Sequence, residues 1–180
     1  MSGSTWLIAG SGLFLVGAAI GVPRVFMTTD AEERLRLLTE RVVLWRVAQV
    51  LYSLGPVLTA IGVVEYGLAL GAGVGLLLVS GGTAMVVGSL LWSYSCWLRG
   101  LDPVGWNQGK QPGWPFRSYV LLTLAGLAAL GLALLLADSP TWLGWVVLAA
   151  DLGYLILFVA TDDIPPFVFY VLLILVGIAY

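Results

Sequence analysis

Six apolar runs, each long enough to cross a lipid bilayer as a helix, constrain this chain more than any other feature of its sequence. A membrane-spanning helix needs roughly 20 mostly apolar residues to cross a hydrocarbon layer about 30 Å thick. A helix also satisfies its own backbone hydrogen bonds in lipid, so an all-α bundle is the expected architecture. The predicted spans are Trp6–Val25, Val42–Val64, Leu70–Trp92, Tyr119–Ala137, Trp142–Ala160 and Ile164–Tyr180.

The composition indicates that lipid is the solvent for much of the chain. Of the 180 residues, 60% are hydrophobic and only 10% are charged. A soluble domain of this size buries only about two-thirds of the surface that its unfolded chain exposes, which would leave too much apolar surface in water. The run 121–136 does not alternate between apolar and polar residues, as a barrel strand would. We therefore predict that residues 1–180 form a single polytopic membrane domain, a bundle of six transmembrane helices.

The basic residues predict how this bundle is oriented. The second and fourth connections between spans carry only the acidic residues Glu65 and Asp138. Because basic connections stay on the cytoplasmic side, the first, third and fifth connections should be cytoplasmic and both termini non-cytoplasmic. The expected location is the cytoplasmic (inner or plasma) membrane. The eight basic residues lie in or beside the first and third connections: Arg24, Arg34, Arg36, Arg41, Arg46, Arg99, Lys110 and Arg117.

A short amphipathic helix is predicted on the cytoplasmic surface, before the second span. Residues 30–46 combine charged and apolar positions at helical spacing. Thr29 and Glu32 fit a capping box, in which each side chain satisfies a free backbone N–H of the first turn. This segment should therefore start at Thr29 and lead directly into the second span.

Small residues recur at intervals of four, for example at Gly17 and Gly21 and again at Gly67, Gly71 and Gly75. Such spacing lets the backbones of two helices approach closely, which favours packing in lipid. Packing within the bundle is one interpretation of the pattern. The alternative is an interface with a second copy or with a partner membrane subunit.

Asp151 is the one ionisable residue predicted near the middle of a span, where a carboxylate costs a few kcal/mol. We expect it to face the bundle interior with Tyr154, which follows at i+3. Polar residues of the second and third spans could join them in a cavity for a proton or a small ligand. These are Arg46, Gln49, Tyr52 and Ser53 in the second span, and Ser80, Thr83, Ser89 and Ser93 in or beside the third. A helix–helix hydrogen bond that only holds the bundle together is the alternative.

The third connection, residues 94–118, is rich in aromatic and basic side chains. Tryptophan prefers the headgroup layer, so an interfacial loop is the simplest interpretation. The alternative is a lid that recognises an anionic lipid headgroup. The residues that would form it are Arg99, Lys110, Arg117, Trp97, Trp106 and Trp114.

The lack of histidine and the presence of a single cysteine, Cys96, exclude several kinds of site. These are a disulfide framework, a Cys/His zinc site, an iron–sulfur cluster and bis-histidine haem. No catalytic residue, metal or cofactor is predicted, and no nucleic-acid partner. We favour a non-enzymatic membrane protein that binds lipid or another hydrophobic ligand, or serves as an accessory subunit. A small proton-coupled carrier using Asp151 is the alternative, and a membrane enzyme acting on a lipid-soluble substrate comes third.

Overall fold

A computed structural model of the chain describes residues 2–21, 23–137, 140–165 and 167–179. The structure is 87% helix, and no strand occurs in these ranges. Asp138 of the predicted fourth connection and Tyr180, the last residue of the predicted sixth span, lie outside them. The helices are α1 (Gly3–Ile20), α2 (Arg24–Met27), α3 (Ala31–Glu40), α4 (Val42–Leu70), α5 (Val74–Leu101), α6 (Pro103–Asn107), α7 (Trp114–Leu136), α8 (Thr141–Thr161) and α9 (Phe167–Ala179).

Five of these helices, α1, α4, α5, α7 and α8, are long and apolar enough to cross a membrane. They correspond to the first five predicted spans. The structure does not confirm a sixth span, because α9 has 13 residues. At 1.5 Å per residue such a helix is about 20 Å long, well short of a hydrocarbon layer about 30 Å thick. The part of the chain that is described is thus an apolar helical bundle of the kind that multi-pass membrane proteins form.

Helices α4 and α5 are longer than the spans predicted from hydropathy. With 29 and 28 residues, each would be more than 40 Å long at roughly 1.5 Å per residue. The apolar pattern locates only the part of a helix that suits hydrocarbon, whereas the backbone stays helical until a breaker stops it. Here the breakers are Gly71 and Gly73, whose positive φ values of 75° and 81° turn the chain between the two helices. At its other end α5 continues to Leu101, nine residues beyond Trp92, where the predicted third span ends.

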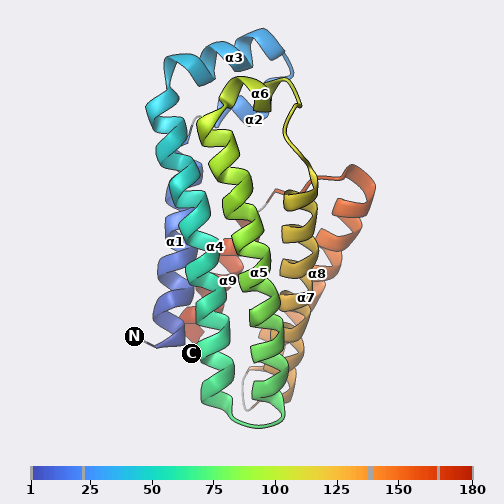
Figure 1. Cartoon of the computed structure of the whole chain (residues 1–180). Helices are drawn as coiled ribbons and strands as arrows, with labels where there is room; N and C mark the ends of the chain where they lie inside the picture. The colour runs from blue at the N-terminus through green and yellow to red at the C-terminus, as the bar shows by residue number, and fades with distance from the viewer. Residues whose placement is uncertain (1, 22, 138–139, 166, 180) are drawn as a thin grey trace.

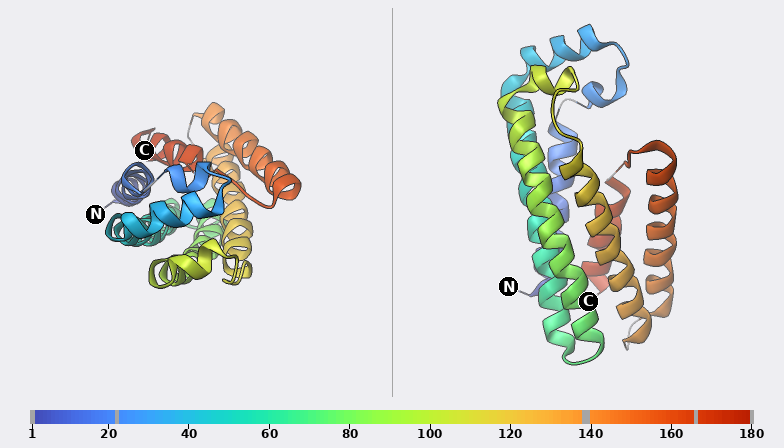
Figure 2. Two further views of the ribbon diagram at one scale, coloured as in Figure 1. Left: turned by 90° about the horizontal axis from the view of Figure 1, so that it is seen from above. Right: turned by 45° about the vertical axis from the view of Figure 1, so that its right-hand side comes forward.

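The long helices pack in a sequence of neighbours. Helix α4 lies between α1 and α5, helix α5 also packs on α7, and α7 packs on α8 (Figures 1 and 2). Helix α9 returns to pack on α1 and has little contact with α8. Buried aromatic rings join distant segments, such as Phe14 of α1 and Tyr170 of α9, whose ring centroids are 3.9 Å apart. This order places α8 at the edge of the bundle, away from α4.

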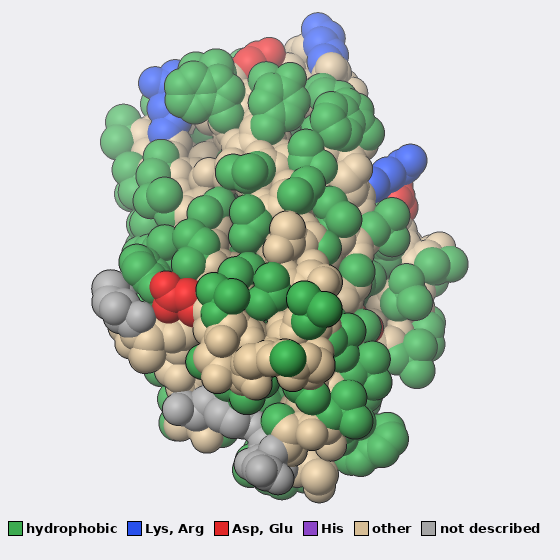
Figure 3. Space-filling model, turned by 60° about the horizontal axis from the view of Figure 1, so that its bottom comes forward, with side chains coloured by type: hydrophobic (Ala, Val, Ile, Leu, Met, Phe, Trp, Pro, Cys, Tyr) green, Lys and Arg blue, Asp and Glu red, His purple; other side chains and the backbone are tan. Residues whose placement is uncertain are grey.

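The short helices α2, α3 and α6 lie across one end of the bundle, and both chain termini lie toward the other end (Figure 1). A second, smaller cluster of buried side chains holds this end together: Val25, Leu37, Leu38 and Trp45, with Trp106 packed against them. Figure 3 views the molecule from the opposite end, with hydrophobic side chains over much of the face and Lys and Arg toward its upper and right-hand margins. The basic residues of the first and third connections are thus gathered at one end of the fold.

Helix α3 begins and ends differently from the prediction. Its N-cap is Asp30, whose carboxylate accepts hydrogen bonds from the backbone N–H groups of Glu32 and Glu33, and not Thr29. The capping box with Thr29 was therefore wrong, because Asp30 satisfies the same free donors from one residue later. The helix also stops at Glu40, since Arg41 leaves helical geometry before α4 begins. The segment is a separate helix and does not lead continuously into α4.

Candidate functional site

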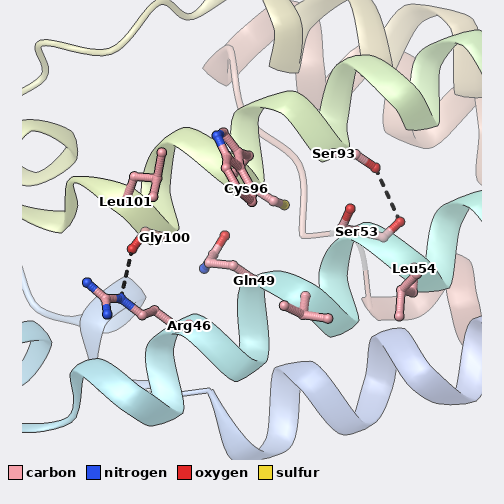
Figure 4. A pocket seen from close by; sticks show the side chains of 10 residues that line it. Arg46, Gln49, Ser53, Leu54, Ser93, Cys96, Gly100 and Leu101 are labelled. Atoms are coloured by element: carbon pink, nitrogen blue, oxygen red, sulfur yellow. Dashed lines mark hydrogen bonds between the residues drawn. The ribbon is translucent and has the colours of Figure 1, made fainter.

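A cavity lies between α4 and α5, in the half of these helices that faces α3 and α6 (Figure 4). Its volume is about 360 Å³. We call it the α4–α5 groove. Five of its residues come from each helix: Arg46, Gln49, Val50, Ser53 and Leu54 from α4, and Ser93, Cys96, Trp97, Gly100 and Leu101 from α5.

Helical periodicity explains why polar residues gather in this groove. Positions 46, 49 and 53 lie on one face of α4, and positions 93, 96 and 100 lie on one face of α5, because residues three or four apart are neighbours on a helix. The two helices run antiparallel, so Arg46 is opposite Gly100 and Ser53 is opposite Ser93 (Figure 4). Two facing rows of small or polar residues result.

Pro56 adds a second reason for polar contacts along this seam. A proline inside a helix has no N–H for the carbonyl four residues earlier, which here is that of Tyr52. The indole Nε1 of Trp92 donates to this carbonyl at 2.9 Å. At the next position of α5, the Ser93 hydroxyl donates to the Ser89 carbonyl at 2.8 Å and lies 3.4 Å from the Ser53 carbonyl. The α4 helix remains continuous through Pro56 because a neighbouring helix satisfies the freed carbonyl.

The side chain of Gln49 is the most unusual group in the groove. It is only 3% exposed, yet neither its Oε1 nor its Nε2 atom has a hydrogen-bond partner in the described part of the chain. A buried polar group left unpaired costs about 1–3 kcal/mol. The amide points into the space between the helices (Figure 4). Gln49 therefore offers one donor and one acceptor site to whatever occupies the groove.

The mouth and walls of the groove are mainly apolar. Val50, Leu54, Trp97 and Leu101 line it and are also among the exposed large hydrophobic residues of the molecule. Arg46 lies at the end nearest α3, where its Nε atom donates to the Gly100 carbonyl at 3.1 Å. The groove thus combines a cation at one end, an unpaired amide inside and an apolar opening at the side.

The structure places the other residues of the predicted cavity elsewhere. Asp151 and Tyr154 lie on α8, which packs on α7, and neither lines the α4–α5 groove. Tyr52 is buried and contacts Phe14 of α1, with ring centroids 5.0 Å apart. Of the cavity expected among the second, third and fifth spans, the second and third come together in the groove, whereas the fifth does not join them because α8 lies at the edge of the bundle. Hydropathy cannot reveal which helices become neighbours.

Tyr154 has a role that the sequence did not suggest. Its hydroxyl donates to the Pro165 carbonyl at 3.0 Å and accepts from the backbone N–H of Phe169, also at 3.0 Å. The second bond satisfies one of the free N–H groups in the first turn of α9. Tyr154 therefore ties α8 to α9 rather than pairing with Asp151. Asp151 is half-buried, and its Oδ1 atom has no hydrogen-bond partner among the described residues.

The six residues of the predicted lid also separate in the structure. Trp97 lines the α4–α5 groove, whereas Arg99 and Trp106 come together in a second, smaller cavity. Arg117 forms an ion pair with Asp162 of the α8–α9 connection. Lys110 and Trp114 are exposed. The third connection is thus folded against the end of the bundle by α6, and not one continuous lid.

Sequence reasoning anticipated only part of the α5 side of the groove. Ser93 was named among the polar residues of the predicted cavity, whereas Cys96 and Gly100 had no assigned role. The signal was present in their spacing, 93, 96 and 100, which matches the spacing 46, 49 and 53 in α4.

In the described ranges, no three His, Cys, Asp or Glu side chains come together as metal ligands would.

Comparison with protein-family models, with curated proteins and with solved structures finds no match for this chain. Its function must therefore be argued from the geometry of its own residues.

Proposed function

We propose that this protein is a non-enzymatic integral membrane protein that binds a lipid-like amphiphile in the α4–α5 groove. The polar part of the ligand would lie against Gln49 and toward Arg46. Its apolar part would leave past Val50, Leu54 and Leu101 into the surrounding acyl chains. A membrane lipid has this chemistry, with hydroxyl, ester and phosphate groups at one end and hydrocarbon at the other.

The unpaired amide of Gln49 is the observation that carries this proposal. Buried polar groups in proteins are hydrogen-bonded with few exceptions, so an orphan amide needs an explanation. A ligand that both donates and accepts hydrogen bonds would remove the cost at Oε1 and Nε2 together. Ligand sites also combine mostly apolar walls with a few polar groups, as this groove does.

A small proton-coupled carrier is the second candidate, and Asp151 is the observation that favours it. Its Oδ1 atom is buried without a partner among the described residues, and an ionisable residue inside a span is a candidate for function. The polar residues expected to continue its path, Gln49 and Ser53, belong to a different cavity. For this reason the amphiphile-binding function has the stronger support.

The test is to replace Gln49 with leucine and measure which lipids stay bound. We expect Gln49→Leu to weaken lipid binding by the purified protein about 30-fold, because two hydrogen bonds of about 1 kcal/mol each are lost. The thermal stability of the ligand-free protein should stay the same or rise, since an apolar side chain of similar size removes the unpaired amide. Native mass spectrometry of protein released from membranes measures the retained lipid.

Gln108→Leu is the matched control. Gln108 is exposed and lines neither cavity, so the same chemical change there should leave lipid retention unaltered. Equal retention in Gln49→Leu and Gln108→Leu would contradict the proposal. A Gln49→Leu protein that loses stability while keeping its lipid would assign the amide a purely structural role.

A further inference from the structure

We propose that a second cavity, beneath α6, is a binding site for a phosphate-type anion centred on Arg99. This cavity has a volume of about 170 Å³ and shares no lining residue with the α4–α5 groove. The inference therefore does not depend on the function proposed for that groove. The residues that line this cavity include Ser95, Arg99, Trp106, Gln111 and Phe116.

The guanidinium of Arg99 lies over two indole rings. Its central carbon lies 4.7 Å from the centroid of the Trp92 ring and 5.6 Å from that of Trp106. Stacking of this kind fixes the plane of a guanidinium while leaving its N–H groups free at the edge. Trp92 comes from α5 and Trp106 from α6, so the packing of α6 on the end of α5 preorganises the cation.

The Arg99 guanidinium has no counter-ion or acceptor of its own. Its Nε atom is buried without a hydrogen-bond partner, and none of the ion pairs among the described residues includes Arg99. Asp163 acts on it electrostatically but stays beyond ion-pair distance. A half-buried cation whose Nε donor has no partner is costly, and an anion in the adjoining cavity would remove that cost.

Three of the last carbonyl groups of α5 already accept hydrogen bonds from other side chains. The last carbonyls of a helix lack intrahelical partners and carry partial negative charge, which would ordinarily attract an arginine in the last turn. Here the Leu98 carbonyl accepts from Gln111, the Arg99 carbonyl from Trp45, and the Gly100 carbonyl from Arg46. Among the described residues Arg99 Nε still has no acceptor, so this donor is open to a group outside the chain.

The size and surroundings of the cavity favour a phosphate group. Arginine presents planar N–H donors that match the oxygens of phosphate, and the Ser95 side chain lines the same cavity. The cavity is less than half the volume of the groove, which suits a headgroup but not an acyl chain. Lys110 stands between the lining residues Gly109 and Gln111 and adds positive charge nearby. The phosphate could belong to a lipid headgroup or be free in solution.

The experiment titrates inorganic phosphate into the full-length protein in detergent and follows tryptophan fluorescence, since Trp92 and Trp106 lie beside Arg99. We expect a saturable change that is weakened at least about tenfold in Arg99→Gln, because charge-assisted hydrogen bonds are lost. Arg99→Lys keeps the charge but not the planar donors, so binding should weaken several-fold. Arg36→Gln is the control, since it removes one arginine from the exposed surface of α3 at the same end of the molecule.

A second arm identifies the source of the phosphate. The same variants are placed in nanodiscs of phosphatidylcholine alone or with phosphatidylglycerol, and native mass spectrometry measures the retained lipid. Loss of phosphatidylglycerol in Arg99→Gln but not in Arg36→Gln would assign the site to a lipid headgroup. A phosphate response without any change in lipid retention would assign it to a soluble anion. The proposal is overturned if both Arg99 variants bind inorganic phosphate and phosphatidylglycerol as well as Arg36→Gln does. If Arg99→Gln does not fold, the comparison of Arg99→Lys with Arg36→Gln decides the outcome.

Discussion

Gly10 illustrates how single residues set the spacing of this bundle. A Cβ atom on Gly10 would lie 2.5 Å from the backbone nitrogen of Thr59 and 2.6 Å from the Gly55 carbonyl oxygen. Both atoms belong to the backbone of α4, so they cannot move aside as a side chain would. Two residues further along α1, a Cβ atom on Gly12 would meet nothing within 4 Å. The close contact between α1 and α4 therefore depends on Gly10 and not on Gly12.

We expect Gly10→Ala to lower the free energy of unfolding by about 1–3 kcal/mol, because the added methyl group forces two backbones apart. Gly12→Ala should be neutral or slightly stabilising, since alanine favours the helix and the site is open. Thermal unfolding of the two variants in the same detergent makes the comparison. Equal stabilities would mean that α1 does not approach α4 as closely as the structure has it.

At the scale of elements, the end of α5 is the point at which the bundle and its basic cap are joined. Three side chains donate to the last carbonyls of α5: Trp45, Arg46 and Gln111. The Trp45 indole nitrogen lies 2.9 Å from the Arg99 carbonyl oxygen. Trp45 is fully buried and also belongs to the cluster that holds α2 and α3. One indole thus connects the start of α4, the end of α5 and the short helices.

Trp45→Phe should destabilise the protein by about 1–3 kcal/mol, since it removes this hydrogen bond and leaves a small cavity. The loss should be largest at the basic end, where hydrogen exchange of α3 and α6 would speed up. Trp142→Phe makes the same change at a residue that is 61% exposed, and there we expect little effect. Hydrogen exchange read by mass spectrometry distinguishes the two; similar exchange in both variants would show that Trp45 does not join these helices.

At the scale of the whole molecule, the distribution of basic residues and the positions of the termini indicate the same orientation in a membrane. The basic connections lie at the end covered by α2, α3 and α6, and the two termini lie toward the other end (Figure 1). Basic connections stay in the cytoplasm, which we propose for this end of the bundle. The termini would then face the non-cytoplasmic side, and the α4–α5 groove and the Arg99 cavity would lie near the inner leaflet. That leaflet carries anionic lipid, which suits both sites.

Labelling of introduced cysteines tests this orientation. In a Cys96→Ala background, which removes the single native thiol, Ser2→Cys should react with a membrane-impermeant maleimide added to intact cells. Thr39→Cys, on the exposed surface of α3, should react only after the membrane is permeabilised. The reverse pattern would place the basic end outside the cell.

The sequence alone was sufficient to predict an all-helical membrane bundle and the positions of its first five long helices. These features depend on local properties, because an apolar run of sufficient length satisfies lipid and its own backbone without reference to other segments. The sixth predicted span is not confirmed because α9 is short, and the Thr29 cap is wrong because Asp30 accepts from the same N–H groups. The first residue of a helix depends on which of several suitable capping residues accepts from the free N–H groups, and the sequence pattern alone does not determine this.

Only the tertiary structure decided which polar residues share a site. Gln49, Ser53 and Ser93 were predicted to join Asp151, but the packing order of the helices puts Asp151 on an edge helix and brings Cys96 and Gly100 to Gln49 instead. It likewise places Arg99 over the rings of Trp92 and Trp106, which are 14 positions apart in the sequence. Periodicity determines the face of a helix on which a residue lies. The neighbour that this face meets depends on side-chain packing between helices, because lipid supplies no hydrophobic force to select one apolar face over another.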